Sequence, residues 1–412
     1  MSYEMKAPWQ ITAVEGIDPT FADKGVAHDF PLGTVLIKIV GRRPDGRILL
    51  VTSRNYQQRL DFQVIQLMED GSFDLSFAQD GILSGGFKDG AQAYTYGAQL
   101  FPDGRILLIG THYGDIEYLA FGRYLADGTP DATFGDNGVV LRPRSSVSGH
   151  HLPALSHLVD TPRTNTAIGP NDEIIMASGS GISRYDRHGE VDLSFNGTGN
   201  VTPSFNITDI GIARNGSMTL VGHNTYGEAV MARYRANGSL EESFGNHGEI
   251  KVRVNDTDSR FTSLLLRDDG SLFAAGVMDD VFGDIWGERR RGFLTAYNAN
   301  GQPNLVFGGG RPVISLIPSK QPNVWNDIGG SPEDGIVVVG YAGRIGSEET
   351  LIGRYRATGE VDLSFGTHGF LQTDIGFQRE LWESVVVQPD RKIIACGDVF
   401  VWVRGCLARF LA

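Results

Sequence analysis

The sequence has few of the features that mark several large classes of protein. Only two of its 412 residues are cysteine, so no framework of disulfides can hold the chain together. No stretch approaches 18 consecutive apolar residues, which argues against a membrane-spanning helix. Lys and Arg number 36 against 49 Asp and Glu, and the net charge of −13 argues against nucleic acid or an anionic membrane as a partner.

Short motifs of common enzyme families are also missing. The chain contains no G-x-S-x-G elbow, no H-E-x-x-H motif, no P-loop and no dinucleotide fingerprint between a strand and a helix. The Asp-box of sialidase-type propellers, S-x-D-x-G-x-x-W, is absent as well. Residues 1–15 have no apolar core of signal-peptide length, so we expect a cytoplasmic or non-classically exported protein.

The two cysteines, Cys396 and Cys406, flank one predicted hairpin in "IIACGDVFVWVRGC". They could face each other across it, but two cysteines alone favour buried free thiols. The sequence leaves open whether they pair.

The sequence is rich in glycine and contains an internal repeat. Its 54 glycines follow no collagen period and predict many tight turns. The stretch "ATGEVDLSFGTHGF" at 357–370 returns in altered form along the chain, and each copy carries one phenylalanine, at spacings of 49 to 63 residues. The seven phenylalanines are Phe21, Phe77, Phe134, Phe195, Phe244, Phe307 and Phe365.

Two further landmarks also occur seven times. One is an Asp-Gly turn or its equivalent before an apolar run, as in "PDGRILLVTS", and the other is a run such as "LIGRYRATG". Each unit therefore holds four short apolar and β-branched runs bounded by Gly, Asn and Asp, the pattern of antiparallel strands and hairpins. This predicts an all-β fold, a seven-bladed β-propeller with four antiparallel strands per blade.

The two ends of the chain complement each other. The last unit stops at "CLARFLA" without a fourth strand, and "GIDPTFADKGVAHDF" near the start supplies a phenylalanine turn and a strand with nothing before them. We expect a strand at about 25–30 to complete the C-terminal blade, which removes the open seam. Residues 16–412 then form a single domain, and residues 1–15 precede it as an extension.

Most units contain a basic and an acidic residue eight positions apart. We expect each pair to form a charge-assisted hydrogen bond, here called an arginine pin, that braces the outer hairpin of its blade. The pairs are Arg123 and Asp131, Arg184 and Asp192, Arg233 and Glu241, and Arg354 and Asp362. Gln66 and Asp74 are a hydrogen-bonding version without the arginine, and Ala296 and Asn304 replace both partners in a further blade. In the closing blade the pair would be Arg409 and Asp18, from opposite chain ends.

The pattern "RYxxxGxxDxSFGxxG", followed by a turn similar to "QPDGKI", resembles the delta-60 repeat, a bacterial β-propeller repeat. The resemblance covers residues 16–412, with departures at Gly16, in "NLVFGGGRP" and in "GPNDE". It implies the fold but no general activity and no catalytic residues.

A binding site is expected on the face formed by the second-to-third hairpins and the blade-to-blade connections, here called the variable face. These loops differ in length and content, and binding residues tend to lie on irregular loops carried by a rigid scaffold. Residues 141–166 carry His150, His151 and His157, which we interpret as part of a solvated loop rather than a metal site. Residues 277–292 are a candidate partner contact.

Aromatic residues beside Asp, Asn or Glu in this region are candidate ligand contacts, because such groups stack on a sugar ring and bind its hydroxyls; packing between blades is the alternative for each. In the loops they are Tyr56, Tyr113, Tyr226, Trp286 and Trp402. At the starts of innermost strands they are Tyr94, Phe261, Trp325 and Trp382, with Asp327 and Glu383 as polar neighbours.

Two functions from different classes fit these features. The first is a non-enzymatic binding protein that recognises a carbohydrate or a protein through the variable face at the mouth of the channel. The alternative is a hydrolase or lactonase-like propeller, with carboxylates of Asp115, Asp209, Asp327 and Glu383 meeting across the channel. No catalytic residue is assigned, and no cofactor is expected unless these oxygens bind calcium. A scaffold with a plugged channel is a third possibility.

Overall fold

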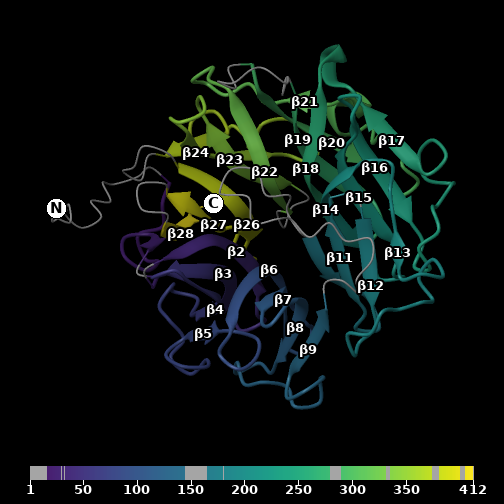
Figure 1. The fold of residues 1–412 in the computed structure, drawn as a ribbon. Coiled ribbons are helices and arrows are strands. Elements are labelled where there is room, and N and C mark those ends of the chain that lie inside the picture. Colours follow the sequence, from purple (N-terminus) through teal and green to yellow (C-terminus); the bar gives the residue numbers. More distant parts are fainter. Residues whose placement is uncertain are drawn as a thin grey trace.

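The computed structural model describes residues 16–411 except 29, 32, 144–164, 180, 279–288, 331–334, 374–379 and 400–403. The described strands form seven four-stranded antiparallel sheets that surround a common centre (Figure 1). The seven-bladed β-propeller predicted from the repeats is therefore confirmed. No helix in the described ranges is long and apolar enough to cross a membrane. The proposed extension at 1–15 lies outside the described residues.

In each blade, four strands follow one another from the channel outwards. The innermost strands are β2 (Thr34–Arg42), β6 (Gln92–Leu100), β10 (Asn165–Ile168), β14 (Asn206–Ile212), β18 (Ser259–Leu266), β22 (Asn323–Gly330) and β26 (Glu380–Val387). The second strands are β3 (Ile48–Tyr56), β7 (Ile106–Tyr113), β11 (Ile174–Ser178), β15 (Met218–His223), β19 (Leu272–Met278), β23 (Ile336–Ala342) and β27 (Ile393–Val399).

The outer two layers continue the same order. The third strands are β4 (Arg59–Leu67), β8 (Glu117–Tyr124), β12 (Gly181–Tyr185), β16 (Ala229–Tyr234), β20 (Arg291–Tyr297), β24 (Glu349–Tyr355) and β28 (Arg404–Phe410). The outermost strands are β5 (Ile82–Gly85), β9 (Val139–Pro143), β13 (Asn200–Val201), β17 (Glu249–Val252), β21 (Val313–Ile314), β25 (Phe370–Thr373) and β1 (Val26–Ala27). Two short 3₁₀ turns, η2 (Val254–Asp256) and η3 (Gly308–Gly310), complete the described elements. Blades are numbered by their innermost strand, so that β2–β5 form blade 1.

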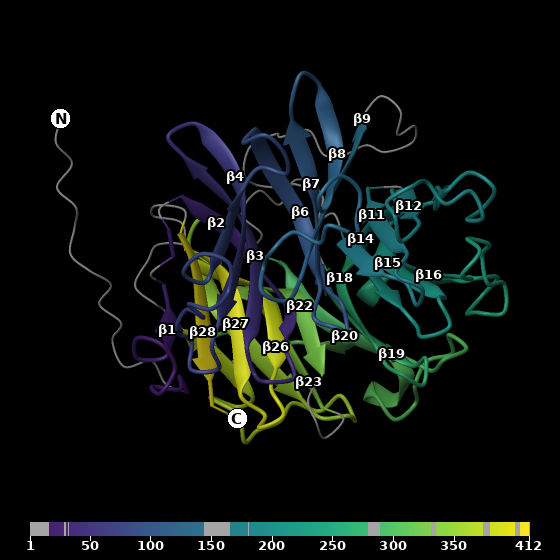
Figure 2. The same cartoon turned by 90° about the horizontal axis from the view of Figure 1, so that it is seen from below.

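The ring is closed by the N-terminal strand. Strand β1 pairs with β28 as the fourth strand of blade 7, with Val26 opposite Ala408, and Figure 2 shows the two strands side by side. The Asp18 N–H donates to the Arg409 carbonyl at 2.8 Å, and the Arg409 N–H donates to the Gly25 carbonyl at 3.0 Å. The predicted exchange of a strand between the chain ends is confirmed.

The hydrophobic core is divided among the blade interfaces. Seven apolar clusters are present, and each combines side chains of two neighbouring blades. The phenylalanine turn closes each interface from the outside: Phe77 is buried against Gly128 of the next blade, where an added Cβ would lie 3.1 Å from its ring. Gly128 also has a φ of +86°, so both its backbone conformation and its contact require glycine.

Four of the five expected arginine pins are present with their predicted partners. The Nε atoms of Arg123, Arg184, Arg354 and Arg409 donate to Asp131, Asp192, Asp362 and Asp18 at 2.7 to 2.8 Å. Each guanidinium also lies over the phenylalanine of its own blade, at 4.5 to 4.8 Å from the ring centroid.

Three pins also reach the following blade. Arg123 donates to the Arg187 carbonyl at 3.2 Å and Arg409 to the Glu69 carbonyl at 2.7 Å, and Arg184 makes the equivalent bond to Ala236. The pins therefore link neighbouring blades as well as brace single hairpins.

Blade 4 does not form the predicted pair between Arg233 and Glu241. The Arg233 Nε donates instead to Thr219 Oγ1 at 3.0 Å. In blade 2, Asp131 also accepts the N–H of the residue two positions later, Thr133, at 3.0 Å. The longer side chain of Glu241 does not fit this compact turn, so its carboxylate leaves the arginine and accepts from the Ser243 hydroxyl at 3.3 Å.

Blade 1 has a replacement for its missing arginine. Gln66 donates to Asp74 at 2.7 Å and accepts from the Arg43 Nε at 2.6 Å. Arg43, from the first-to-second turn, then donates to the Ala126 carbonyl of blade 2 at 3.0 Å. Between blades 3 and 4, Arg184 donates to the carbonyl of Ala236, which occupies the same turn position as Ala126. The interface of blades 1 and 2 therefore keeps a guanidinium at this place, although its arginine comes from the first-to-second turn.

The cysteines do not face each other. In the register of β27 and β28, Cys396 lies opposite Leu407 and Cys406 opposite Gly397. Adjacent residues of a strand point to opposite faces, so the two side chains lie on opposite faces of the sheet. Neither cysteine forms a disulfide, and the two side chains are buried in different clusters, Cys396 against blade 1 and Cys406 against blade 6.

Replacing Asp18 by asparagine is expected to lower the free energy of unfolding by about 3 to 5 kcal/mol, the usual cost of breaking a buried ion pair. The Asp18 and Arg409 side chains are only 2% and 6% exposed. Burial alone would raise the pKa of Asp18, but hydrogen bonds from Thr20 and Lys392 and the charge of Arg409 hold it below its ordinary 3.8. Such a group stabilises the fold above a pH of about 4 and loses this contribution at lower pH.

Urea unfolding of the wild type and the variant between pH 2.5 and 7 would measure both effects. The matched control is Asp362→Asn, whose pair lies within blade 6 and whose side chain is 20% exposed. Equal losses in the two variants would contradict a special role for the pair that joins the chain ends.

Candidate functional site

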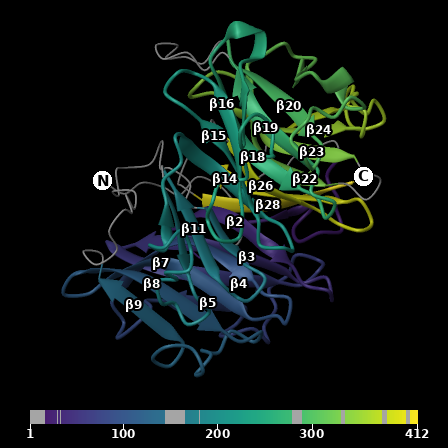
Figure 3. The ribbon, with the colours of Figure 1, turned by 90° about the vertical axis from the view of Figure 1, so that its right-hand side faces the viewer.

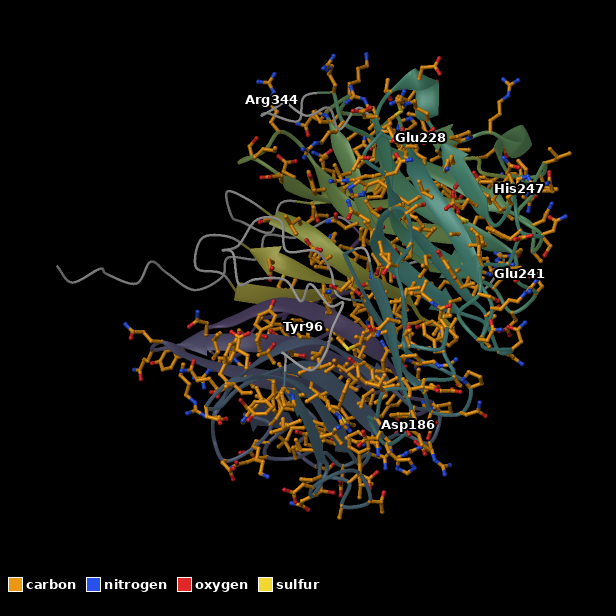
Figure 4. The ribbon with its side chains drawn as sticks, turned by 45° about the vertical axis from the view of Figure 1, so that its right-hand side comes forward. Tyr96, Asp186, Glu228, Glu241, His247 and Arg344 are labelled. Atoms are coloured by element: carbon orange, nitrogen blue, oxygen red, sulfur yellow. The ribbon has the colours of Figure 1, made fainter. Side chains whose placement is uncertain are left out.

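A polar cavity of about 220 Å³ lies at the centre of the ring, and all seven innermost strands contribute to its wall. Figure 3 shows β14, β18, β22 and β26 gathered in the middle of the molecule. In Figure 4, Tyr96 of the cavity wall lies near the centre, whereas Glu241 and His247 lie at the outer edge.

One equivalent position of every innermost strand lines this cavity. It is the residue paired with the fourth residue of the second strand, and its seven occupants are Lys38, Gly97, Asn165, Asp209, Ser263, Asp327 and Ser384. With Glu383, the wall holds three carboxylates and one ammonium group.

A β-bulge precedes this position in six blades. The register skips one residue between Ile207 and Asp209, between Phe261 and Ser263, between Trp325 and Asp327, and likewise in β2, β6 and β26. A bulge re-aims the side chains beside it. In β14, β18, β22 and β26 the bulge therefore brings a polar residue into the channel two positions after a large aromatic or aliphatic residue that points into the blade interface.

Ser263 lies between two carboxylates, and these three side chains are here called the carboxylate bridge. Its Oγ is 2.9 Å from Asp209 Oδ2 and 2.8 Å from Asp327 Oδ1. Each carboxylate also accepts a backbone N–H of the following blade, Asp209 from Leu264 at 2.8 Å and Asp327 from Val385 at 2.9 Å. The bridge therefore joins blades 4 to 7 along the channel wall.

Burial raises the pKa of Asp209 to about 6, and the neighbouring charge of Asp327 acts in the same direction. Hydrogen bonds from Leu264, Ile210 and Ser263 oppose this shift only in part. Asp209 therefore exchanges a proton in the near-neutral range, where an ordinary aspartate is already ionised.

The prediction that Trp325 and Trp382 contact a ligand is wrong. Both are fully buried between blades. Trp325 donates from Nε1 to Ser315 Oγ at 2.7 Å and stacks on Phe370, and Trp382 packs edge-on against Phe410 at 5.9 Å. The residue before each bulge points into the interface rather than the channel mouth, so neither indole can reach a ligand.

The other predicted contacts are separated by the structure. Asp327 and Glu383 line the cavity, whereas Asp115 lies on a hairpin tip and accepts from Tyr118 at 2.8 Å. Tyr94 is partly buried, packs edge-on against Tyr96, and has a pKa raised by burial.

Tyr113 and Tyr226 lie at hairpin tips of the variable face, and Trp286 and Trp402 fall outside the described residues. His150, His151 and His157 also fall outside them. Within the part of the chain that is described, no group of three His, Cys, Asp or Glu side chains could hold a metal ion.

Four second-to-third hairpins expose one large apolar side chain at or beside the tip. These tip residues are Tyr56, 39% exposed, Ile116, 48%, Tyr226, 77%, and Ile345, 38%. They belong to blades 1, 2, 4 and 6, and the corresponding tips of blades 3, 5 and 7 include residues outside the described ranges.

A second exposed set lies on the opposite, uniform face and belongs to the repeat itself. It consists of the leucine after the acid, or its equivalent, in four phenylalanine turns: Leu75, Leu193, Leu305 and Leu363. Sequence reasoning singled out Tyr56 and Tyr226 but missed Ile116 and Ile345, because a single isoleucine in a hairpin carries no signal of exposure.

Comparisons with known proteins agree with the fold. The DUF5122 β-propeller domain, a domain of unknown function, matches residues 43–77 and 102–134, which run from the first-to-second turn to the phenylalanine turn in blades 1 and 2. No curated protein matches the chain.

Two solved structures resemble the chain at low identity. A chain in the crystal structure of the Mitotic Checkpoint Complex is 9% identical, with 100% of this chain and 98% of that chain covered and a TM-score of 0.49. The WD40 domain of Toxoplasma gondii coronin is 6% identical, with coverages of 94% and 89% and a TM-score of 0.47.

Truncating Trp325 to alanine is expected to destabilise the fold by about 3 to 5 kcal/mol, because it leaves a large cavity between blades 5 and 6. Tyr226→Ala is expected to change stability by less than about 0.5 kcal/mol, since the ring is mostly exposed. Urea unfolding of the two variants beside the wild type measures the difference. A small effect of Trp325→Ala would contradict its role in the interface.

Proposed function

We propose that this protein is a non-enzymatic binding protein that recognises a protein partner through the variable face of the propeller. The observation that carries the proposal is the repetition of the tip residues on four hairpins of one face. Single exposed apolar residues are ordinary on a protein surface, but this set recurs at or beside the tip of the same hairpin in four blades, on loops that otherwise differ. Tyrosine and large aliphatic groups on such loops suit the centre of a protein interface.

The distribution of aromatic residues favours a protein partner over a carbohydrate. A sugar ring needs an exposed aromatic face with hydrogen-bonding groups beside it. Trp325 and Trp382, the strongest predicted stacking residues, are buried, and two of the four tip residues are isoleucines. An aliphatic side chain offers no π-face to a sugar but packs well against apolar groups of a protein.

The carboxylates that line the cavity support the alternative function, that of a hydrolase. Asp209 and Asp327 already accept hydrogen bonds from backbone N–H groups of the next blade and from Ser263. Because these contacts tie both carboxylates to the wall, we assign them to joining the blades rather than to catalysis. The propeller fold itself hosts binding, scaffolding and catalysis alike.

The repeat is proposed to be of the bacterial delta-60 type. The matched segments 43–77 and 102–134 support this, because each spans the turn and strands that contain the repeated pattern. The proposed assignment adds no activity.

Photo-crosslinking in the source cells would test the proposed surface. A crosslinking residue replaces Tyr226 on the variable face or, as the matched control, Leu193 on the uniform face. We expect a discrete crosslinked protein from position 226 only. After its identification, the purified partner is titrated against the wild type and against a variant with all four tip residues changed to serine.

The tip variant should bind the purified partner at least ~10-fold more weakly, the effect of losing about 1.4 kcal/mol of interface energy. A variant with Leu75, Leu193 and Leu363 changed to serine should bind as the wild type does. Equal weakening in both variants would contradict the proposed face. Binding on a glycan array, run with calcium and with EDTA, would favour the carbohydrate function instead.

A further inference from the structure

The carboxylate bridge is built from three consecutive blades. Asp209 comes from β14 of blade 4, Ser263 from β18 of blade 5 and Asp327 from β22 of blade 6. All three occupy the same position of their innermost strands, directly after a bulge. The contact is therefore a product of the ring geometry, which brings equivalent positions of neighbouring blades together around the channel.

The bridge has fewer protons than its contacts require when both carboxylates are ionised. Ser263 Oγ lies within 2.9 Å of one carboxylate oxygen and 2.8 Å of another, and a hydroxyl group carries one proton. With both acids ionised, one contact would place two oxygen atoms together without a proton between them. One additional proton satisfies both contacts: Asp209 donates to Ser263, and Ser263 donates to Asp327.

The carboxylates are held in place by further hydrogen bonds. Asp209 Oδ1 accepts the Ile210 N–H at 2.8 Å, and its Oδ2 accepts the Leu264 N–H at 2.8 Å. Asp327 Oδ1 accepts the Ile328 N–H at 2.9 Å, and its Oδ2 accepts the Val385 N–H at 2.9 Å. Rotation of either carboxylate away from Ser263 would break bonds to the backbone.

Other titratable and charged groups surround the bridge. Lys38, Tyr96 and Glu383 share the cavity wall with the bridge. Other titratable or charged groups on the strands packed against it lie at the ends where the innermost strands begin: His223, Arg260, Tyr341, Glu380 and Asp398. The buried Cys396 of β27 lies opposite Ser384, and burial raises the pKa of its thiol. Asp327 is the charged neighbour that favours the protonated form of Asp209.

We infer that the folded protein holds one additional proton on the carboxylate bridge and that its loss with rising pH loosens the contact among blades 4, 5 and 6. The bridge is thus a pH-sensitive clasp in the wall of the channel, closed in acidic solution. Once the proton has left, two negative charges share one hydroxyl group in the channel wall, and their repulsion opposes the contact.

The direction of the effect follows from the raised pKa of Asp209, about 6 in the folded protein against an ordinary value of 3.8. A raised pKa stabilises the fold fully below the unfolded value, and the contribution is lost as the pH rises through the folded value. The stability of the protein should therefore fall between pH 4 and pH 6 by the release of about one proton per molecule.

Urea unfolding at intervals from pH 4 to 8, in buffer with EDTA, tests the clasp. Asp209→Asn is expected to lose the part of the pH dependence that corresponds to about one proton, whatever its stability at any single pH. Asp327→Asn should keep the transition but shift it to lower pH, because the neighbouring charge is gone.

Asp115→Asn, on an exposed hairpin tip, is the matched control and should follow the wild type throughout. Amide hydrogen exchange adds a local measurement: the Leu264 N–H should lose protection above pH 6 relative to the Leu107 N–H of blade 2. An unchanged pH dependence in Asp209→Asn would overturn the shared proton. Equal behaviour of the two amides would overturn the loosening of blades 4 to 6.

Discussion

The propeller depends on one contact between its two chain ends. Phenylalanine turns pack between neighbouring blades, and in blades 1, 2, 3, 4 and 7 an arginine also donates to a backbone carbonyl of the next blade. In blade 7 that arrangement requires Asp18 and β1 from the start of the chain. Without them, β28 would present a free edge, and blade 7 would lack its fourth strand.

Much of this architecture was predictable because a repeat shows each position several times. The number of blades, the four strands in each and the exchange of the N-terminal strand follow from aligned landmarks alone. The spacing of eight also identified four arginine pins. It failed for Arg233, where one additional methylene in Glu241 changes the turn, and for the cysteines, where sequence distance says nothing about which face of a strand a side chain takes.

The site was harder to predict, for physical reasons. Buried interfaces and binding surfaces are both rich in tryptophan, so the sequence alone does not show which of the two contains Trp325 and Trp382. Their burial is decided by bulges, which place the aromatic residue in the interface and the next-but-one residue in the channel. Asp327 and Glu383 were identified near the channel, but Ser263 and Lys38 were missed. Aligning the repeats on the second strand, position by position, is the signal that would have found them.

The pairing of Asp18 with Arg409 also has a consequence for biosynthesis, since the two residues are 391 positions apart. At typical translation rates of about 5–20 residues per second, the N-terminal strand waits roughly 20–80 s for its partner. Blades 1 to 6 can assemble in order during that interval, each against its predecessor, while the first strand stays unpaired. The final step is set by the arrival of β28 from the ribosome, so the duration of the open ring is governed by translation speed.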